Sequence, residues 1–245
     1  MCLGYHAHMS FNKKSFFLSG QITPPKSQVE LLARCDALAG KTLGCVAETL
    51  GLSVPDNLKV YKGWVGALLE TALGADAGNR AEPDFIGLGI EMKTLPLNKL
   101  GFPKESTYVC SVSMQQTGEL RWEESWLRRK LSHVLWVPVE AERTIPLAER
   151  YIGQSWLWQP SSEQEALLKR DWEELMDRIV LGSQSNITAK EGEYLQIRPK
   201  AAHSRIVTRG VSEEGDYENI NPKGFYLRTS FTQSILARVV GITID

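Results

Sequence analysis

The sequence predicts an α/β protein in which helices cover the faces of a central β-sheet. Amphipathic helical patterns occupy residues 27–38, 64–73 and 163–180, where apolar side chains recur every three or four positions. Residues 86–93 alternate between apolar and other side chains, as half-buried strands do. Residues 133–139 are almost wholly apolar, which is typical of a central strand covered on both faces.

Length and composition limit the function classes. A chain of 245 residues buries roughly 70–75% of its extended surface, enough for one large domain or two lobes. The net charge of −1 means that any surface for a polyanion is a local patch. The four cysteines are scattered without metal-ligand spacing, which favours a reducing cytoplasm over a disulfide framework. No apolar run is long enough to span a membrane, so we expect no membrane partner.

Residues 1–22 lack periodicity, and we expect a flexible N-terminal tail ahead of a single folded domain over residues 23–245. Met9 is an alternative start of the chain, which N-terminal sequencing of the native protein tests. In the folded part, Ser27 and Glu30 form a capping box and Gly74 ends a helix. We expect helices over 27–38, 42–51, 63–73, 125–130, 163–180 and 229–241, strands over 86–93, 107–113, 133–139, 194–198 and 225–227, and a loop over 215–221.

The alternating stretch 86–93 carries unusual residues on its polar face. If the stretch is one strand, its apolar side chains face the core, while Glu91 and Lys93 project side by side roughly 7 Å apart. Gly87 and Gly89 share that face. Glycines weaken a strand and often mark a close approach to the backbone.

Asp84 lies just upstream, after a proline. If it converges on Glu91, two like charges share a small space, and a divalent cation such as Mg2+ would relieve their repulsion. Lys93 would then orient or deprotonate a water, or steady a phosphate, as metal-assisted cleavage of a phosphodiester requires. An unbroken strand would point Asp84 into the core, so the hypothesis requires a turn or bulge at one of the glycines. The alternative is a surface ion pair of little consequence.

Two further features depend on the tertiary structure. Glu70 lies opposite the apolar stripe of its helix; it is either a solvated residue or, if the helix borders the cleft, a third carboxylate. The stretch 194–212 has no acidic residue and follows an acidic helix, an asymmetry that suits a grip on a polyanion. Within it, Arg198 and Lys200 flank a proline and suit the reading of guanine. Their alternative role is solubilising charge.

The motif from Pro83-Asp84 to Glu91-x-Lys93 resembles the core of the restriction-endonuclease-like nucleases. Longer stretches between about residues 27 and 240 resemble the MutH family of DNA mismatch repair endonucleases; they are 62–66, 68–70, 128–131, 134–140, 171–177 and 192–202. The resemblance implies a mixed β-sheet flanked by helices. It also implies an N-terminal lobe with the carboxylates and a C-terminal lobe with the basic turn, with DNA in the cleft between them.

The implied activity is a Mg2+-dependent nick, with Mn2+ as a possible substitute, in the unmethylated strand of hemimethylated GATC, 5′ to the guanine. The resemblance implies activation by the mismatch-repair ATPase MutL. Action as a monomer follows if one site cuts one strand. By position it implies metal binding by Asp84 and Glu91, catalysis by Asp84, Glu91, Lys93, Glu70 and Lys130, and DNA contacts by Lys62, Arg198, Lys200 and Tyr226, of which Tyr226 would sense adenine methylation.

Two departures and two alternatives stay open. The family usually has histidines at positions 126 and 129, where this chain has Trp126 and Arg129, so the contacts to phosphate are in question. A GATC-specific restriction endonuclease that cuts both strands is one alternative. A methylation-sensing DNA-binding module with a decayed site is the other, and the intact Asp84, Glu91 and Lys93 speak against it.

Overall fold

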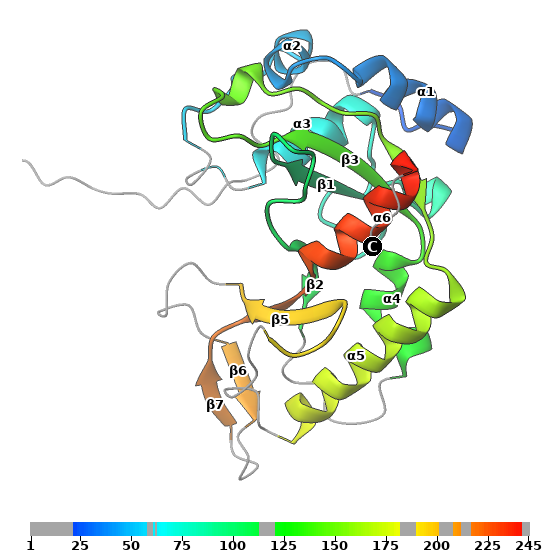
Figure 1. The fold of residues 1–245 in the computed structure, drawn as a ribbon, viewed down its shortest axis with the longest axis vertical. Helices are drawn as coiled ribbons and strands as arrows, with labels where there is room; N and C mark the ends of the chain where they lie inside the picture. The colour runs from blue at the N-terminus through cyan, green and yellow to red at the C-terminus, as the bar shows by residue number, and fades with distance from the viewer. Residues whose placement is uncertain are drawn as a thin grey trace, which may run out of the picture.

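The computed structural model describes residues 22–57, 61, 63–112, 121–181, 190–200, 208–211 and 217–241, so the expected tail lies outside the described residues except for Ile22. The predicted α/β class is confirmed (Figure 1). The helices are α1 (Gln28–Leu38), α2 (Leu43–Thr49), α3 (Trp64–Leu73), α4 (Trp126–Leu131), α5 (Ser162–Val180) and α6 (Thr229–Val240), with 3-10 turns η2 (Ile86–Leu88), η3 (Trp122–Glu124) and η4 (Leu147–Glu149). The strands are β1 (Glu91–Leu97), β2 (Thr107–Ser111), β3 (Val134–Glu140), β4 (Trp156–Trp158), β5 (Leu195–Pro199), β6 (Thr208–Val211), β7 (Tyr217–Ile220) and β8 (Lys223–Leu227).

The described strands form three small sheets. The first has the order β1-β3-β4, with β1 parallel to β3 and β4 antiparallel to it, so the sheet is mixed. The second has the antiparallel order β2-β8-β5. The third is the antiparallel pair β6-β7. In Figure 1, α1–α3 lie with β1 and β3 in the upper part, and α4, α5, β2 and β5 lie in the lower part.

The central strand β3 is covered on both faces, as its apolar sequence predicts. Leu135, Val137 and Val139 pack into one hydrophobic cluster with α1–α3. Val134 and Trp136 point the other way, into a second cluster with α4, α5, α6 and the β2-β8-β5 sheet. The alternation of strand side chains therefore divides the core into two parts on opposite faces of one strand.

The prediction of one strand over residues 86–93 is wrong for its first half. Residues 86–88 form the η2 turn, and Gly89 ends it with φ 65°, a left-handed conformation that glycine adopts without strain. Phe85 and Ile90 then pair with each other across the turn, and β1 begins at Glu91. The chain therefore bends between Asp84 and Glu91, as the metal-site hypothesis requires.

The prediction of a loop over residues 215–221 is wrong for residues 217–220, which form β7 and pair with β6, while residues 215 and 216 lie outside the described residues. The turn residues Gly215 and Asp216 lie between the two paired segments in the sequence, and the pairing supplies the backbone hydrogen bonds that a loop would lack. Pro199 ends β5 at the edge of its sheet, where its missing N–H is tolerated. None of the described helices is long and apolar enough to cross a membrane.

Candidate active site

A pocket of about 550 Å³ is lined by side chains from α3, the bend, β1, β2 and α4. The structure brings all five of the predicted catalytic residues into its lining, namely Glu70, Asp84, Glu91, Lys93 and Lys130. Lys62, expected near them, lies outside the described residues. Because α3 borders the pocket, Glu70 stands at the site as a third carboxylate.

The bend at Gly89 turns the chain back so that Asp84 reaches the start of β1. Asp84 Oδ2 accepts a hydrogen bond of 2.8 Å from the backbone N–H of Met92. The backbone N–H of Glu91 donates to the carbonyl of His133, just before the parallel strand β3. Both carboxylates are thus fixed to the mixed sheet at the same end of β1.

The Glu91 side chain is only 2% exposed and is held by two lysines. The ammonium groups of Lys93 and Lys130 lie 2.5 Å and 2.7 Å from the same oxygen, Glu91 Oε1. The other oxygen, Oε2, is buried and has no hydrogen-bond partner in the described structure. A buried carboxylate oxygen without a partner is costly unless a ligand completes it.

The pocket perturbs the ionisation of its groups. Burial, together with the negative charges of Glu91 and Glu70, raises the pKa of Asp84 to about 6. Burial opposes the charge on Lys93 most strongly, but the carboxylates of Glu91, Asp84 and Glu70 together outweigh burial, so the pKa of Lys93 is raised above its usual value. Lys93 therefore carries its proton at neutral pH, while Asp84 is poised to lose or gain one.

These residues fit a hard divalent cation. The unpartnered Glu91 Oε2 and the like-charged Asp84 and Glu70 supply oxygen ligands whose repulsion a cation would relieve. Within the described part of the chain, no group of three or more His, Cys, Asp or Glu side chains is placed to hold a metal ion by itself. Mg2+ is usually held by one or two carboxylates, and water and phosphate oxygens complete its shell.

The raised pKa of Asp84 predicts a stability effect. Between about pH 4 and pH 6 the folded chain binds this proton more tightly than the unfolded chain, so stability falls as pH rises through that window. Asp84→Asn removes the charge, and its amide oxygen still accepts from Met92. We expect its melting temperature without metal to exceed that of the parent by roughly 3 °C at pH 7.5 and to equal it near pH 4.

Thermal unfolding in chelator at both pH values measures this difference. Asp56→Asn, which changes an exposed carboxylate, serves as the control and should leave the melting temperature unchanged. A less stable Asp84→Asn variant at pH 7.5 would contradict the repulsion inferred in the pocket.

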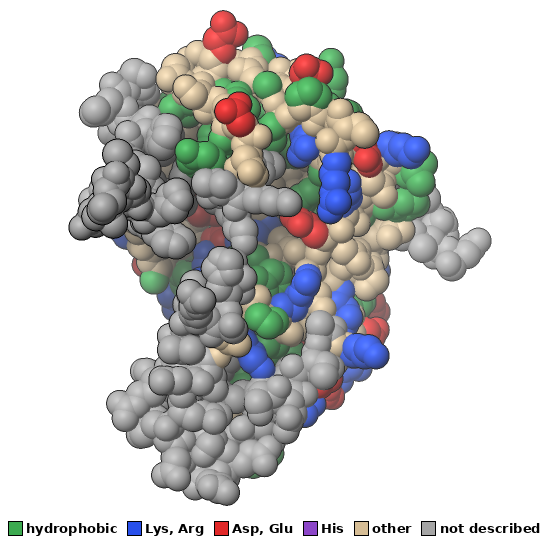
Figure 2. Space-filling view, turned by 90° about the vertical axis from the view of Figure 1, so that its left-hand side faces the viewer, with side chains coloured by type: hydrophobic (Ala, Val, Ile, Leu, Met, Phe, Trp, Pro, Cys, Tyr) green, Lys and Arg blue, Asp and Glu red, His purple; other side chains and the backbone are tan. Residues whose placement is uncertain are grey.

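The structure also brings together three of the predicted DNA-contacting residues. The Arg198 guanidinium lies 5.7 Å from the centroid of the Tyr226 ring, because β5 and β8 are paired. Tyr226 packs edge-to-face on Tyr108 at 5.3 Å, and the Lys200 ammonium lies 5.1 Å from the Tyr108 centroid. Lys and Arg side chains gather at mid-height on the face shown in Figure 2, which agrees with a local basic surface on a chain of nearly zero net charge.

Two residues that connect the pocket to these side chains are missing from the sequence-based prediction. Tyr108 and Ser111 line the pocket. Ser111 Oγ accepts a hydrogen bond of 2.8 Å from Lys200 and lies 3.0 Å from the Tyr108 hydroxyl. Tyr108 and Ser111 reach these residues because β2 pairs with β8, which lies more than a hundred residues later in the chain, and local sequence does not reveal this pairing.

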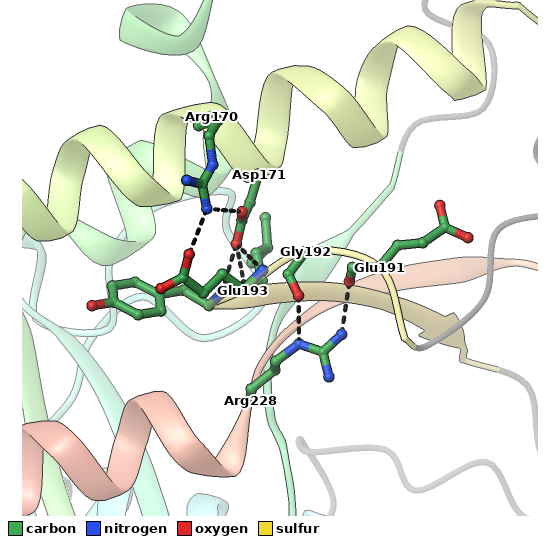
Figure 3. A network of polar contacts seen from close by, with 8 residues as sticks. Arg170, Asp171, Glu191, Gly192, Glu193 and Arg228 are labelled. Carbon is green, nitrogen blue, oxygen red and sulfur yellow. Dashed lines mark hydrogen bonds and ion pairs between the residues drawn. The ribbon is translucent and has the colours of Figure 1, made fainter. Parts of the chain in front are cut away.

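A buried polar network fixes the start of β5 (Figure 3). Asp171 of α5 is 1% exposed, and its Oδ2 accepts from the backbone N–H groups of Glu193, Tyr194 and Leu195 at 2.8, 2.6 and 2.9 Å. Arg228, just before α6, donates to the carbonyls of Gly192 and Glu191. The strand that carries Arg198 is therefore held by side chains from α5 and from the start of α6.

Comparison with known proteins identifies the family. Residues 73–171 match the family model described as DNA mismatch repair enzyme MutH. The DNA mismatch repair protein MutH of Histophilus somni (strain 2336) is 54% identical over 215 residues, which cover 88% of this chain and 96% of that protein. The proteins of the same name from Escherichia coli O17:K52:H18 (strain UMN026 / ExPEC) and E. coli K12 are 50% and 49% identical over 217 residues, covering 89% of this chain and 95% of each relative.

The resemblance expected from the sequence is thereby confirmed, as is the prediction of a DNA repair enzyme. Membership of this family implies the restriction-endonuclease-like fold, and the mixed sheet flanked by helices agrees with it. The chain belongs to the MutH family of DNA mismatch repair endonucleases.

Proposed function

We propose that this protein nicks the unmethylated strand of DNA at hemimethylated GATC sites in a Mg2+-dependent reaction. One observation carries the proposal: a bend in the chain brings Asp84 to Glu91 in a pocket that also holds Lys93 and Lys130. Two carboxylates and two ammonium groups are the parts needed to bind a cation and a phosphate together.

We infer a DNA-binding cleft between two lobes. The support for it is that the pocket is lined both by α3 and β1, which pack on the first hydrophobic cluster, and by β2 and α4, which pack on the second. Duplex DNA bound there would reach the carboxylates on one side and Arg198 and Lys200 on the other. The N-terminal lobe would then carry the chemistry and the C-terminal lobe the recognition.

In this mechanism Asp84 and Glu91 would hold Mg2+, and Glu70 would assist them. The bound ion would polarise a phosphoryl oxygen and acidify a water. Lys93 is protonated at neutral pH because its pKa is raised, so it donates a hydrogen bond to the attacking water or to the phosphate in preference to acting as a base. Lys130, which shares Glu91 Oε1 with Lys93, neutralises charge that develops on the phosphate.

Recognition would fall to Arg198, Lys200 and Tyr226. An arginine or lysine suits the two acceptors of guanine, and an aromatic ring packs differently against adenine and N6-methyladenine. Burial raises the pKa of Tyr226, so its hydroxyl stays neutral and available as a donor. A single site in a monomer cuts one strand, and we infer that MutL activates it.

The test is cleavage of unmethylated, hemimethylated and fully methylated GATC duplexes with Mg2+, Mn2+ or chelator. We expect cuts in unmethylated strands alone, no reaction in chelator, and a faster reaction with MutL and ATP. On supercoiled plasmid with hemimethylated sites we expect nicked circles. Accumulation of linear DNA in place of nicked circles would instead identify a restriction endonuclease that cuts both strands.

Lys200→Ala should lose site preference more than general affinity for DNA. The ammonium of Lys200 is exposed beside Tyr108 and Ser111, where it can reach a base edge. We expect binding to a GATC duplex to weaken about 10- to 100-fold, with less than about 3-fold change on a random duplex. Equilibrium titration of both duplexes at one salt concentration measures the ratio. Lys41→Ala, at an exposed lysine between α1 and α2, is the control, and equal losses on both duplexes would refute base recognition by Lys200.

A further inference from the structure

The short helix α4 gathers one aromatic ring and two cations beside the pocket. Trp126, Arg129 and Lys130 are separated by three and four positions, so they lie on one side of the helix. The Arg129 guanidinium carbon lies 5.4 Å and the Lys130 ammonium 5.1 Å from the Trp126 ring centroid. Both distances are within the range in which a ring face attracts a cation.

The Lys130 ammonium has two different attractive contacts, one with the Glu91 carboxylate and one with the Trp126 ring. Its ammonium lies 2.7 Å from Glu91 Oε1, but the Lys93 ammonium lies 2.5 Å from the same oxygen. Two like charges therefore meet at one acceptor and repel each other. The Trp126 indole also attracts the Lys130 ammonium, and this attraction does not depend on the state of Glu91.

Arg129 is placed differently. Its side chain is exposed, and no described residue accepts a hydrogen bond from its guanidinium. A guanidinium that lies against a ring keeps its N–H edges available for a bidentate bond to phosphate. Lys130 thus lines the pocket and contacts the buried Glu91, while Arg129 is exposed on the same side of α4.

Trp126 joins these groups to the core. It lines the pocket, is half-buried, and packs against the second hydrophobic cluster. We propose that Trp126 is a positioning residue that holds Arg129 and Lys130 as a two-cation binding site for backbone phosphates of the strand to be cut. This inference rests on the proposed nicking function and adds to it the residue that orients its phosphate-binding cations.

The variants Trp126→Leu and Trp126→Phe separate positioning from packing. Leucine keeps apolar bulk against the core but has no ring face, whereas phenylalanine keeps both. We expect single-turnover nicking of a hemimethylated GATC duplex to fall roughly 10-fold in Trp126→Leu and less than about 3-fold in Trp126→Phe. In a Lys130→Gln background, Trp126→Leu should lower the logarithm of the nicking rate by at most half as much as it does in the parent, because one of the cations that Trp126 positions is gone.

A second measurement does not use catalysis. Competitive acetylation of all lysines by a limiting anhydride, read by mass spectrometry, reports how well the Lys130 amine is covered by its neighbours. We expect its labelling relative to exposed Lys41 to rise at least about 3-fold in Trp126→Leu and to stay unchanged in Trp126→Phe. Trp158→Leu, at another half-buried tryptophan that packs on Trp136 and Phe231, controls for loss of core packing and should leave Lys130 labelling unchanged.

Each outcome decides between the two proposals. If the parent protein does not nick GATC duplexes, the proposed function fails, while Lys130 labelling still tests the positioning role. If the parent nicks but Trp126→Leu matches it in rate and labelling, the positioning role alone is wrong. A leucine effect of equal size with and without Lys130 would likewise assign Trp126 to core packing.

Discussion

Glu91→Gln should lower the rate of GATC nicking by at least about 1,000-fold, which corresponds to several kcal/mol of lost transition-state stabilisation. Glutamine keeps the size of the side chain and an oxygen that accepts from both lysines, but it removes the charge that a cation requires. Alanine is a poorer choice, because it leaves two half-buried ammonium groups without their carboxylate. The measurement is single-turnover nicking in Mg2+, with circular dichroism to establish folding.

The reason for so large an effect is the position of Glu91. It is the one residue in the pocket that both lysines contact through a single oxygen, with the other oxygen left without a partner in the described structure. DNA binding in chelator should change little, because the proposed recognition residues lie on β8, on β5 and directly after β5. Glu48→Gln, an exposed carboxylate on α2, is the matched control. Activity of Glu91→Gln within about 10-fold of the parent would remove the proposed mechanism.

How far the sequence predicts the fold depends on how local each signal is. Ser27, Thr42 and Ser125 cap their helices as their sequence context predicts. The central strand β3 is equally well predicted, because an almost wholly apolar run of this length is stable only where both of its faces are buried. Even here the capping box is incomplete: the Glu30 carboxylate accepts from Lys26 N–H and not from Ser27.

The bend before β1 shows where local pattern fails. Residues 86–93 alternate as a strand would, yet Gly89 takes a positive φ and Phe85 pairs with Ile90. Phe85 and Ile90 are 1% and 0% exposed, so the turn is stabilised by packing against α1–α3, and eight residues of sequence do not contain that information. The candidate site is likewise only partly predictable from local sequence. Asp84, Glu91 and Lys93 follow from a short motif, but Tyr108 and Ser111 reach the site only through a pairing with β8.

Asp171→Ala should cost roughly 3–5 kcal/mol of the free energy of unfolding, the largest stability effect that we expect from any single polar residue in the described structure. The substitution leaves the backbone N–H groups of Glu193, Tyr194 and Leu195 without an acceptor where β5 begins. Water cannot fully replace the carboxylate, because Asp171 is 1% exposed and Leu195 is 0% exposed. Urea unfolding followed by circular dichroism measures the loss.

Asp171→Asn and Asp177→Ala refine this prediction. Asparagine can place its amide oxygen where Oδ2 accepts all three hydrogen bonds, so it loses the charge but not the acceptor, and we expect a smaller cost of about 1–2 kcal/mol. Asp177 is exposed on the same helix, and its replacement by alanine should change stability by less than about 0.5 kcal/mol. Amide hydrogen exchange at residues 193–195 should speed up in Asp171→Ala more than exchange in β3 does, because the network fixes the strand that presents Arg198 and Lys200. Equal stability of the two alanine variants would show that the buried carboxylate does not hold β5 in place.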